Sequence, residues 1–167
     1  VAPFTIGLMP VYAVEVFNVG PTGLGTLLTT MGIGSATATL IIATFIDNYR
    51  KGPLILACIA ITMIALIIYS QSSSIGIAIL CLIIISGAMM VTTTITRATT
   101  QRLSDDQFRG RISGFTWAIS GLFPIGGLLS GILAEHLGAS EATLIGAGVL
   151  LFILIFIILF KKTIWRF

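Results

Sequence analysis

Charged residues are scarce in this sequence. Asp, Glu, Lys and Arg make up 9% of its 167 residues, whereas a soluble domain contains about 25%. Hydrophobic residues make up 56% of the chain. Since a soluble fold cannot cover so many apolar side chains with so few charges, the composition excludes a soluble globular protein and indicates one that lies in a lipid bilayer.

The residues that catalysis and metal binding require are also scarce. The chain has one histidine, His136, and two cysteines, Cys58 and Cys81, which stand in separate apolar segments without metal-ligand spacing. A nucleophile elbow, a zinc-protease motif and a pair of acids within an apolar segment are missing. Charged rings and a carbonyl filter motif, the signs of an ion channel, are missing too. We therefore predict no catalytic residue, no cofactor and no bound metal.

The basic residues are few and grouped. They form three clusters, which are Arg50 and Lys51; Arg97, Arg102, Arg109 and Arg111; and Lys161, Lys162 and Arg166. The turns at 18–22, 71–74 and 135–141 contain no Lys or Arg. By the positive-inside rule the clusters face the cytoplasm, which places both chain ends on that side. Because no basic stripe is interleaved with aromatic residues, we predict no nucleic acid partner.

Long apolar segments separate these clusters. A helix needs about 20 apolar residues to cross the bilayer core, and backbone in lipid has to be helical or closed into a barrel. Six segments approach or reach that length: about 1–17, 22–46, 53–70, 75–96, 112–134 and 142–160. We predict an all-α, polytopic membrane protein, with residues 1–167 as one six-helix bundle. The first segment is short and opens without Met, so we expect a fragment of a longer protein.

The six segments divide into two similar triplets. The middle member of each is rich in glycine, and the last member is bulky and almost without polar atoms. Ala43 stands four residues before Asp47, and Gly131 stands four before Glu135 at the opposite face. This pattern is typical of two inverted three-helix repeats. Acids in the loops at helix ends are the alternative explanation.

Three stretches give the chain a likeness to a known family. They are MPVYAVEVFNVGPTGLG at 9–25, QRLSDDQFRGRISGFT at 101–116 and GLFPIGGLLSGILAEHLG at 121–138. The chain resembles the C-terminal six-helix half of a major facilitator superfamily transporter, most like bacterial exporters of macrolides and of siderophores such as enterobactin. The resemblance implies a proton-driven antiporter of the inner membrane that works by alternating access. Its implied partners are the lipid bilayer, the missing N-terminal six-helix half, protons and a small-molecule substrate.

Two sets of residues are candidates for substrate binding or coupling. Glu15 is the one acid inside a predicted span, where it could bind a proton or a cationic substrate. The alternative is that Glu15 lies among the lipid headgroups, where water solvates it. On the fourth segment one helical face carries Ser86, Met90, Thr93 and Arg97. Hydroxyls and a flexible thioether suit loosely selective binding, while packing between helices is the competing account.

Further residues are candidates for conformational roles. We expect the cytoplasmic loops to gate the transporter through Asp47, Arg50, Lys51, Asp105, Asp106, Arg109 and Arg111. Asp47, Arg50 and Lys51 match the superfamily's loop motif only in part, because Ala43 replaces its glycine. Pro124 should kink the fifth helix and form a bending point with Gly121, Gly126 and Gly127. Helix packing explains these glycines equally well.

One rival function remains open at this point. A non-transporting membrane scaffold, or a receptor-like relic of a transporter, would keep the glycines that pack helices and lose the polar face. The polar first members of both triplets favour transport.

Overall fold

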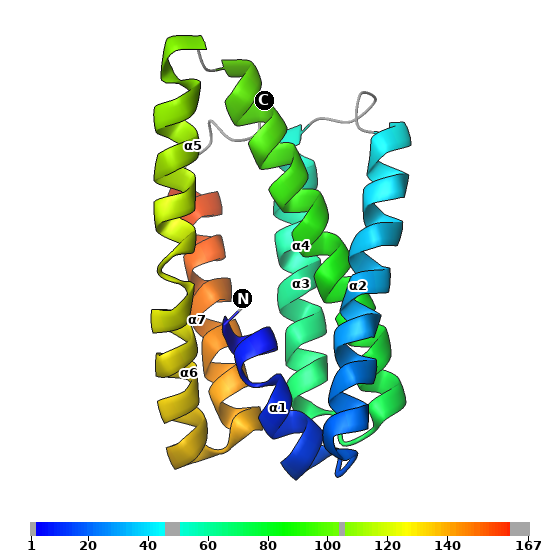
Figure 1. Cartoon of the computed structure of the whole chain (residues 1–167). Helices are drawn as coiled ribbons and strands as arrows, with labels where there is room; N and C mark the ends of the chain where they lie inside the picture. The colour runs from blue at the N-terminus through cyan, green and yellow to red at the C-terminus, as the bar shows by residue number, and fades with distance from the viewer. Residues whose placement is uncertain (1–2, 46–50, 104–105, 161–167) are drawn as a thin grey trace.

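The computed structural model describes residues 3–45, 51–103 and 106–160. All regular structure in these ranges is helical, as Figure 1 shows. The first segment consists of η1 (Pro3–Gly7), α1 (Met9–Val11) and η2 (Tyr12–Val16), where η marks a π-helix. The rest is α2 (Gly20–Phe45), α3 (Lys51–Gln71), α4 (Ile75–Leu103), α5 (Asp106–Ser120), α6 (Phe123–Leu137) and α7 (Ala139–Phe160).

These elements confirm the predicted all-helical membrane fold. Five stretches of helix in the described part of the chain are long and apolar enough to cross a membrane, and Phe4–Val16 is a shorter apolar one. The long ones are Gly20–Thr44, Lys51–Gln71, Ile75–Arg102, Gly110–Leu137 and Ala139–Phe156. The fourth helix continues past the predicted end at 96 as far as Leu103. A helix can leave the apolar layer without ending, because Thr, Gln and Arg side chains suit its emerging turns.

The first segment, predicted as a transmembrane helix at about 1–17, is irregular. Pro10 lacks a backbone N–H and cannot join a regular helical ladder. The backbone around it forms wide π-type turns, and in one of them the Phe17 amide donates to the Tyr12 carbonyl at 2.9 Å. Such turns bend a helix. Asn18 (φ 53°) and Gly20 (φ 61°) then adopt left-handed backbone and turn the chain into α2.

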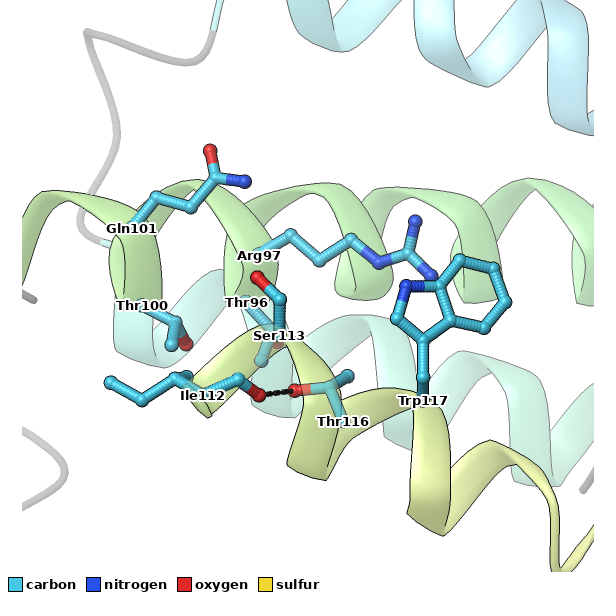
Figure 2. Close-up of a pocket in the computed structure, with 8 residues that line it drawn as sticks. All are labelled: Thr96, Arg97, Thr100, Gln101, Ile112, Ser113, Thr116 and Trp117. Atoms are coloured by element: carbon cyan, nitrogen blue, oxygen red, sulfur yellow. Dashed lines mark hydrogen bonds between the residues drawn. The ribbon is translucent and has the colours of Figure 1, made fainter. Parts of the chain in front are cut away.

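The fifth segment is interrupted between α5 and α6. The Leu122 amide donates to Ile119 at 3.0 Å and the Ile125 amide to Leu122 at 3.1 Å, so single turns replace the regular ladder there. Pro124 is the second residue of α6, where its missing N–H costs no hydrogen bond. The first half of this span, α5, faces α4 across a small pocket drawn in Figure 2.

The helix ends carrying the described basic residues gather at one end of the bundle. Lys51 begins α3, Arg97 and Arg102 lie in the last turns of α4, and Arg111 follows the start of α5. In Figure 1 these ends, and the end of α7, lie at the top. The turns from η2 to α2, α3 to α4 and α6 to α7 lie at the bottom. The alternation from which the orientation was predicted is therefore present in the fold.

The two triplets make equivalent contacts with each other. The second helix of the first triplet, α2, packs on α4, the first helix of the second triplet; likewise α6 packs on η1. The third helices, α3 and α7, pack on each other. Three helices are an odd number of crossings, so the triplets run in opposite directions through the membrane. This arrangement agrees with an inverted repeat.

Both equivalent crossings bring two glycines together. At the α2–α4 crossing, a Cβ added to Gly87 would lie 3.3 Å from the Gly34 carbonyl oxygen. At the η1–α6 crossing, a Cβ on Gly7 would lie 3.7 Å from the Gly127 Cα. Small residues are what membrane helices use for close approach. Packing therefore accounts for Gly34, whereas a Cβ added to Gly127 itself would meet no atom within 4 Å, as is true of several other glycines of these helices.

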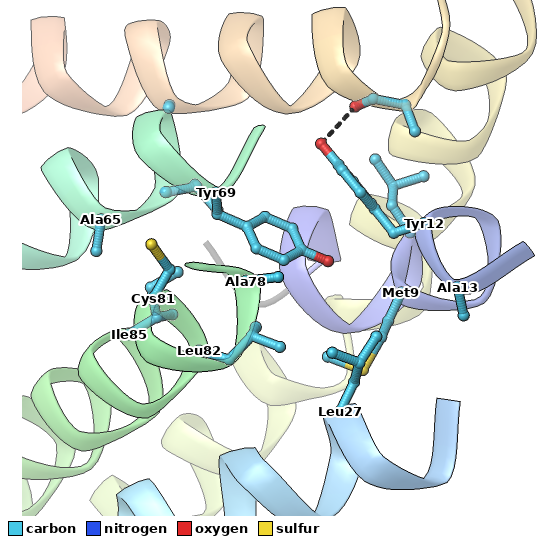
Figure 3. Close-up of a cluster of buried hydrophobic side chains, with 14 of the residues drawn as sticks. Met9, Tyr12, Ala13, Leu27, Ala65, Tyr69, Ala78, Cys81, Leu82 and Ile85 are labelled. Carbon is cyan, nitrogen blue, oxygen red and sulfur yellow. Dashed lines mark hydrogen bonds between the residues drawn. The ribbon is translucent and has the colours of Figure 1, made fainter. Parts of the chain in front are cut away.

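An aromatic cluster fixes the bundle at the end opposite the basic residues (Figure 3). The ring centres of Tyr12 and Tyr69 lie 4.6 Å apart, and those of Tyr12 and Phe17 lie 5.9 Å apart. The Tyr12 hydroxyl donates toward the Ala139 carbonyl at 3.1 Å and the Thr143 hydroxyl at 3.0 Å. This contact ties the first segment to α7. The Tyr69 hydroxyl is buried and has no hydrogen-bond partner among the described residues.

Candidate functional site

One face of α4 lines two neighbouring cavities. Ser86, Met90 and Thr93 belong to the first, a hollow of about 340 Å³ that η1 and α2 complete. Its remaining lining is Ile6, Leu28, Met31, Gly32, Ser35 and Met89. We call it the methionine cavity. Three of the four face residues predicted from helical spacing therefore share one hollow.

Arg97, the fourth of them, lines the second cavity. This hollow of about 160 Å³ lies between α4 and α5, and most of the residues that line it have polar side chains, as Figure 2 shows. Its lining is Thr96, Arg97, Thr100, Gln101, Ile112, Ser113, Thr116 and Trp117. We call it the arginine cavity. The Arg97 guanidinium carbon lies 6.0 Å from the centre of the Trp117 ring, at the outer limit of a cation–π contact.

The hydroxyl groups of the α4 face already donate to their own helix. Thr93 donates to the Met89 carbonyl at 2.8 Å, and Ser86 donates to the Ile83 carbonyl at 3.2 Å. A hydroxyl that donates still has lone pairs with which to accept. These side chains therefore offer acceptors to a ligand, and donors have to come from elsewhere.

The opposite side of α4 has a different character. A groove of about 460 Å³ lies there between α2, α3 and α4, with Gly34, Ala38, Leu54, Ile84 and Val91 among its lining. Of the described residues that line it, only Thr37 and Cys58 have a side-chain heteroatom. Side chains that are charged or carry a hydroxyl or amide are therefore more numerous among the described residues on the cavity side of α4 than on the groove side.

Glu15 does not join these cavities. It lies on η2, at the end of the bundle opposite Arg97, and its side chain is exposed. Nor is a cluster of metal-binding type found in the described ranges, where no three His, Cys, Asp or Glu side chains come together.

The predicted gating residues are only partly visible. Lys51 is half-buried at the start of α3, and Arg111 is exposed on α5. Asp47, Arg50 and Asp105 lie outside the described residues, as do the side chains of Asp106 and Arg109. Their gating role therefore stays a prediction. Of the predicted hinge residues, Gly121 lies in the turn itself, and Gly126 and Gly127 lie within the first turns of α6.

Several cavity residues escaped the sequence analysis. Trp117, Ser113 and Gln101 line the arginine cavity, and Met31 and Ser35 line the methionine cavity. Ser113 and Trp117 stand four residues apart, so helical spacing alone could have placed them on one face. Tryptophan in an apolar span is also common at the lipid interface, so the sequence alone does not identify Trp117 as a cavity residue.

The comparison with protein families decides the class of the chain. A model of the Major Facilitator Superfamily matches residues 4–164. The chain belongs to the Major Facilitator Superfamily. Members of this superfamily are multi-pass membrane transporters and not enzymes, so the predicted class is confirmed at that level. Comparisons with curated proteins and with solved structures gave no match.

Proposed function

We propose that this chain forms the C-terminal half of a proton-driven exporter of drug-like or siderophore-like small molecules. It would act in the bacterial inner membrane, with both ends of the present chain in the cytoplasm, and by alternating access. The observation that carries the proposal is the α4 face, where two cavities lie side by side on the side away from the apolar groove.

Support for a second half comes from the span formed by α5 and α6. Phe115 and Trp117 are each 70% exposed, and Leu128 is 64% exposed. Little of this span is buried within the chain. The other four long spans are each buried to a larger extent, so this span has the fewest packing partners within the described part of the chain. A further six-helix unit packed against α5 would cover this surface and close the cavities into a central path.

The interruption at Gly121 supports a moving part. α5 is tied to the bundle less than α6, which packs on both η1 and α7. Because a turn separates the two halves, α5 can move while α6 keeps its contacts with η1 and α7. This is the motion that alternating access requires at the cytoplasmic mouth.

Glu15 is the proposed proton site. In the described residues of this chain it is the one acid on the first segment, and its exposed side chain can exchange protons with water on the far side of the membrane from Arg97. A carboxylate that gains and loses a proton during the cycle would couple substrate movement to the proton gradient.

Reconstitution of the full transporter in proteoliposomes tests the proposal. Flux of dyes, macrolides and catecholates should follow an imposed pH gradient and stop when a protonophore collapses it. Glu15→Gln should abolish the dependence on pH, whereas Glu135→Gln, a matched change at the same membrane face, should keep it. Absence of flux for every compound would favour the non-transporting scaffold. Unchanged flux and pH dependence in Glu15→Gln would remove Glu15 from coupling.

A further inference from the structure

We infer that the substrate is an amphipathic organic anion, held with its anionic group at Arg97 and its apolar body along the methionine cavity. This inference rests on the proposed transport function and narrows it to a chemical class. It also assigns different tasks to the two cavities of the α4 face.

Charge is the first reason. Among the described residues that line the two cavities, Arg97 is the only one with an ionisable side chain, and none is an acid. Beside a low-dielectric layer, an unopposed positive charge attracts an anion and repels a cation more strongly than it does in water. Glu15, the acid of the first segment, lies at the opposite end of the bundle and cannot reverse that preference.

The donors around Arg97 are the second reason. A guanidinium presents a planar fork of N–H groups that matches a carboxylate. Gln101 and Ser113 line the same cavity and can donate as well. Thr116 donates to the Ile112 carbonyl at 2.9 Å, so it contributes an acceptor only. The donors thus concentrate at the Arg97 end of the α4 face, where an anionic group needs them.

The volumes of the two cavities indicate which part of the ligand each would hold. The arginine cavity, at about 160 Å³, holds a charged group and little more, since pockets for drug-sized ligands measure about 300–1,000 Å³. The methionine cavity, at about 340 Å³, falls within that range. Thr93 of the methionine cavity and Arg97 of the arginine cavity are one helical turn apart, which is about 6 Å along the axis of α4. One molecule can occupy both.

The lining of the methionine cavity explains what the apolar body can be. Met31, Met89 and Met90 contribute long, unbranched and polarisable side chains from two helices. Such side chains repack around different shapes. We therefore expect strict selection for negative charge and loose selection for the shape of the attached body.

Trp117 lies next to the guanidinium across the cavity. Its ring lies 6.0 Å from the Arg97 guanidinium carbon, and Figure 2 shows the two side chains side by side across the cavity. A face-on aromatic ring leaves the in-plane N–H groups of the guanidinium available. Arg97 in this position can donate to a ligand without first breaking an ion pair within the cavity lining.

Binding of a matched series to the full transporter in detergent tests the inference. The probes are 1-naphthylacetate, its neutral amide and 1-naphthylmethylammonium, measured by titration calorimetry. We expect the carboxylate to bind at least tenfold more tightly than the other two. Arg97→Gln should weaken the carboxylate about tenfold and leave the amide unchanged, and Arg97→Lys should restore part of the difference. Arg102→Gln, an exposed arginine five residues along α4 and outside both cavities, should bind as the wild type does.

Four other results would contradict the inference. Equal binding of the three probes, tighter binding of the cation, or no binding of any probe would overturn the inference. So would an Arg97→Gln variant that weakens all three alike, because a purely structural arginine acts in that way. Flux without anion selectivity would leave the transport proposal standing and reject this one; selectivity without flux would do the reverse.

Discussion

Replacing Gly34 by alanine should force α2 and α4 apart. The new methyl group would lie 2.6 Å from the Ile83 carbonyl oxygen and 2.8 Å from the Ile83 Cα, and it would also meet the Ser86 hydroxyl. Carbon atoms pack best about 3.5–4.0 Å apart, so the helices must separate by roughly 1 Å. The obstructing atoms at Ile83 are backbone, which cannot turn aside as the end of a side chain can.

The expected loss of stability follows from known effects of overpacking. One extra methyl group in a tight contact lowers the free energy of unfolding by about 1–3 kcal/mol. For a bundle of this size, that loss lowers the melting temperature by about 2–12 °C. The assay is size-exclusion chromatography of the detergent-solubilised transporter after heating, with the same incubation for every variant.

Gly32 supplies the matched control two residues earlier on α2. A methyl group there meets no atom within 4 Å, and alanine is favoured over glycine in helix interiors by up to about 1 kcal/mol. Gly32→Ala should therefore melt at the wild-type temperature or slightly above it. If Gly34→Ala melts together with Gly32→Ala, the two helices do not meet at Gly34 and the packing described here is wrong.

Two further pairs of variants test other contacts by the same assay. Tyr12→Phe removes the hydroxyl that reaches Ala139 and Thr143 and should cost about 0.5–1.5 kcal/mol. Tyr69→Phe removes a buried hydroxyl without a described partner, so it should be neutral or stabilising; a larger loss in Tyr69→Phe than in Tyr12→Phe would contradict the aromatic cluster. Gly146→Ala brings a methyl group to 2.7 Å from the Phe4 ring, and because a ring can turn, we expect a loss of only about 0.5–1.5 kcal/mol. Gly148→Ala, which meets nothing within 4 Å, should melt as the wild type does, and equal losses for the two would refute the Phe4 contact.

The spans of this protein could be read from its sequence because the bilayer imposes one simple rule. Any helix that crosses must be apolar for about 20 residues, and the basic loops between such stretches fix their alternation. The interruption near Pro124 was predictable for an equally local reason, the missing N–H of proline. Helical spacing also placed Ser86, Met90 and Thr93 on one face, and the structure lines one cavity with all three.

Contacts between distant helices could not be read in this way. Gly25, Gly32 and Gly34 look alike in the sequence, yet only Gly34 lies against another helix, because the crossing point depends on how α2 is tilted and rotated. The proximity of Arg97 to Trp117 likewise joins two separate helices, α4 and α5, and helical periodicity predicts contacts only within one helix. Exposure of Glu15 depends on the irregular turns around Pro10, which periodicity does not reveal.

Water accessibility of the two sides of α4 tests the central claim most directly. In a variant whose native Cys58 and Cys81 are replaced by alanine, single cysteines at Thr93 and Ile84 report on the cavity side and the apolar-groove side. A membrane-impermeant thiol reagent should modify Thr93→Cys, and a transported compound should slow that reaction, while Ile84→Cys stays unmodified in lipid. Modification of Ile84→Cys with Thr93→Cys protected would show that the polar face does not line an aqueous path.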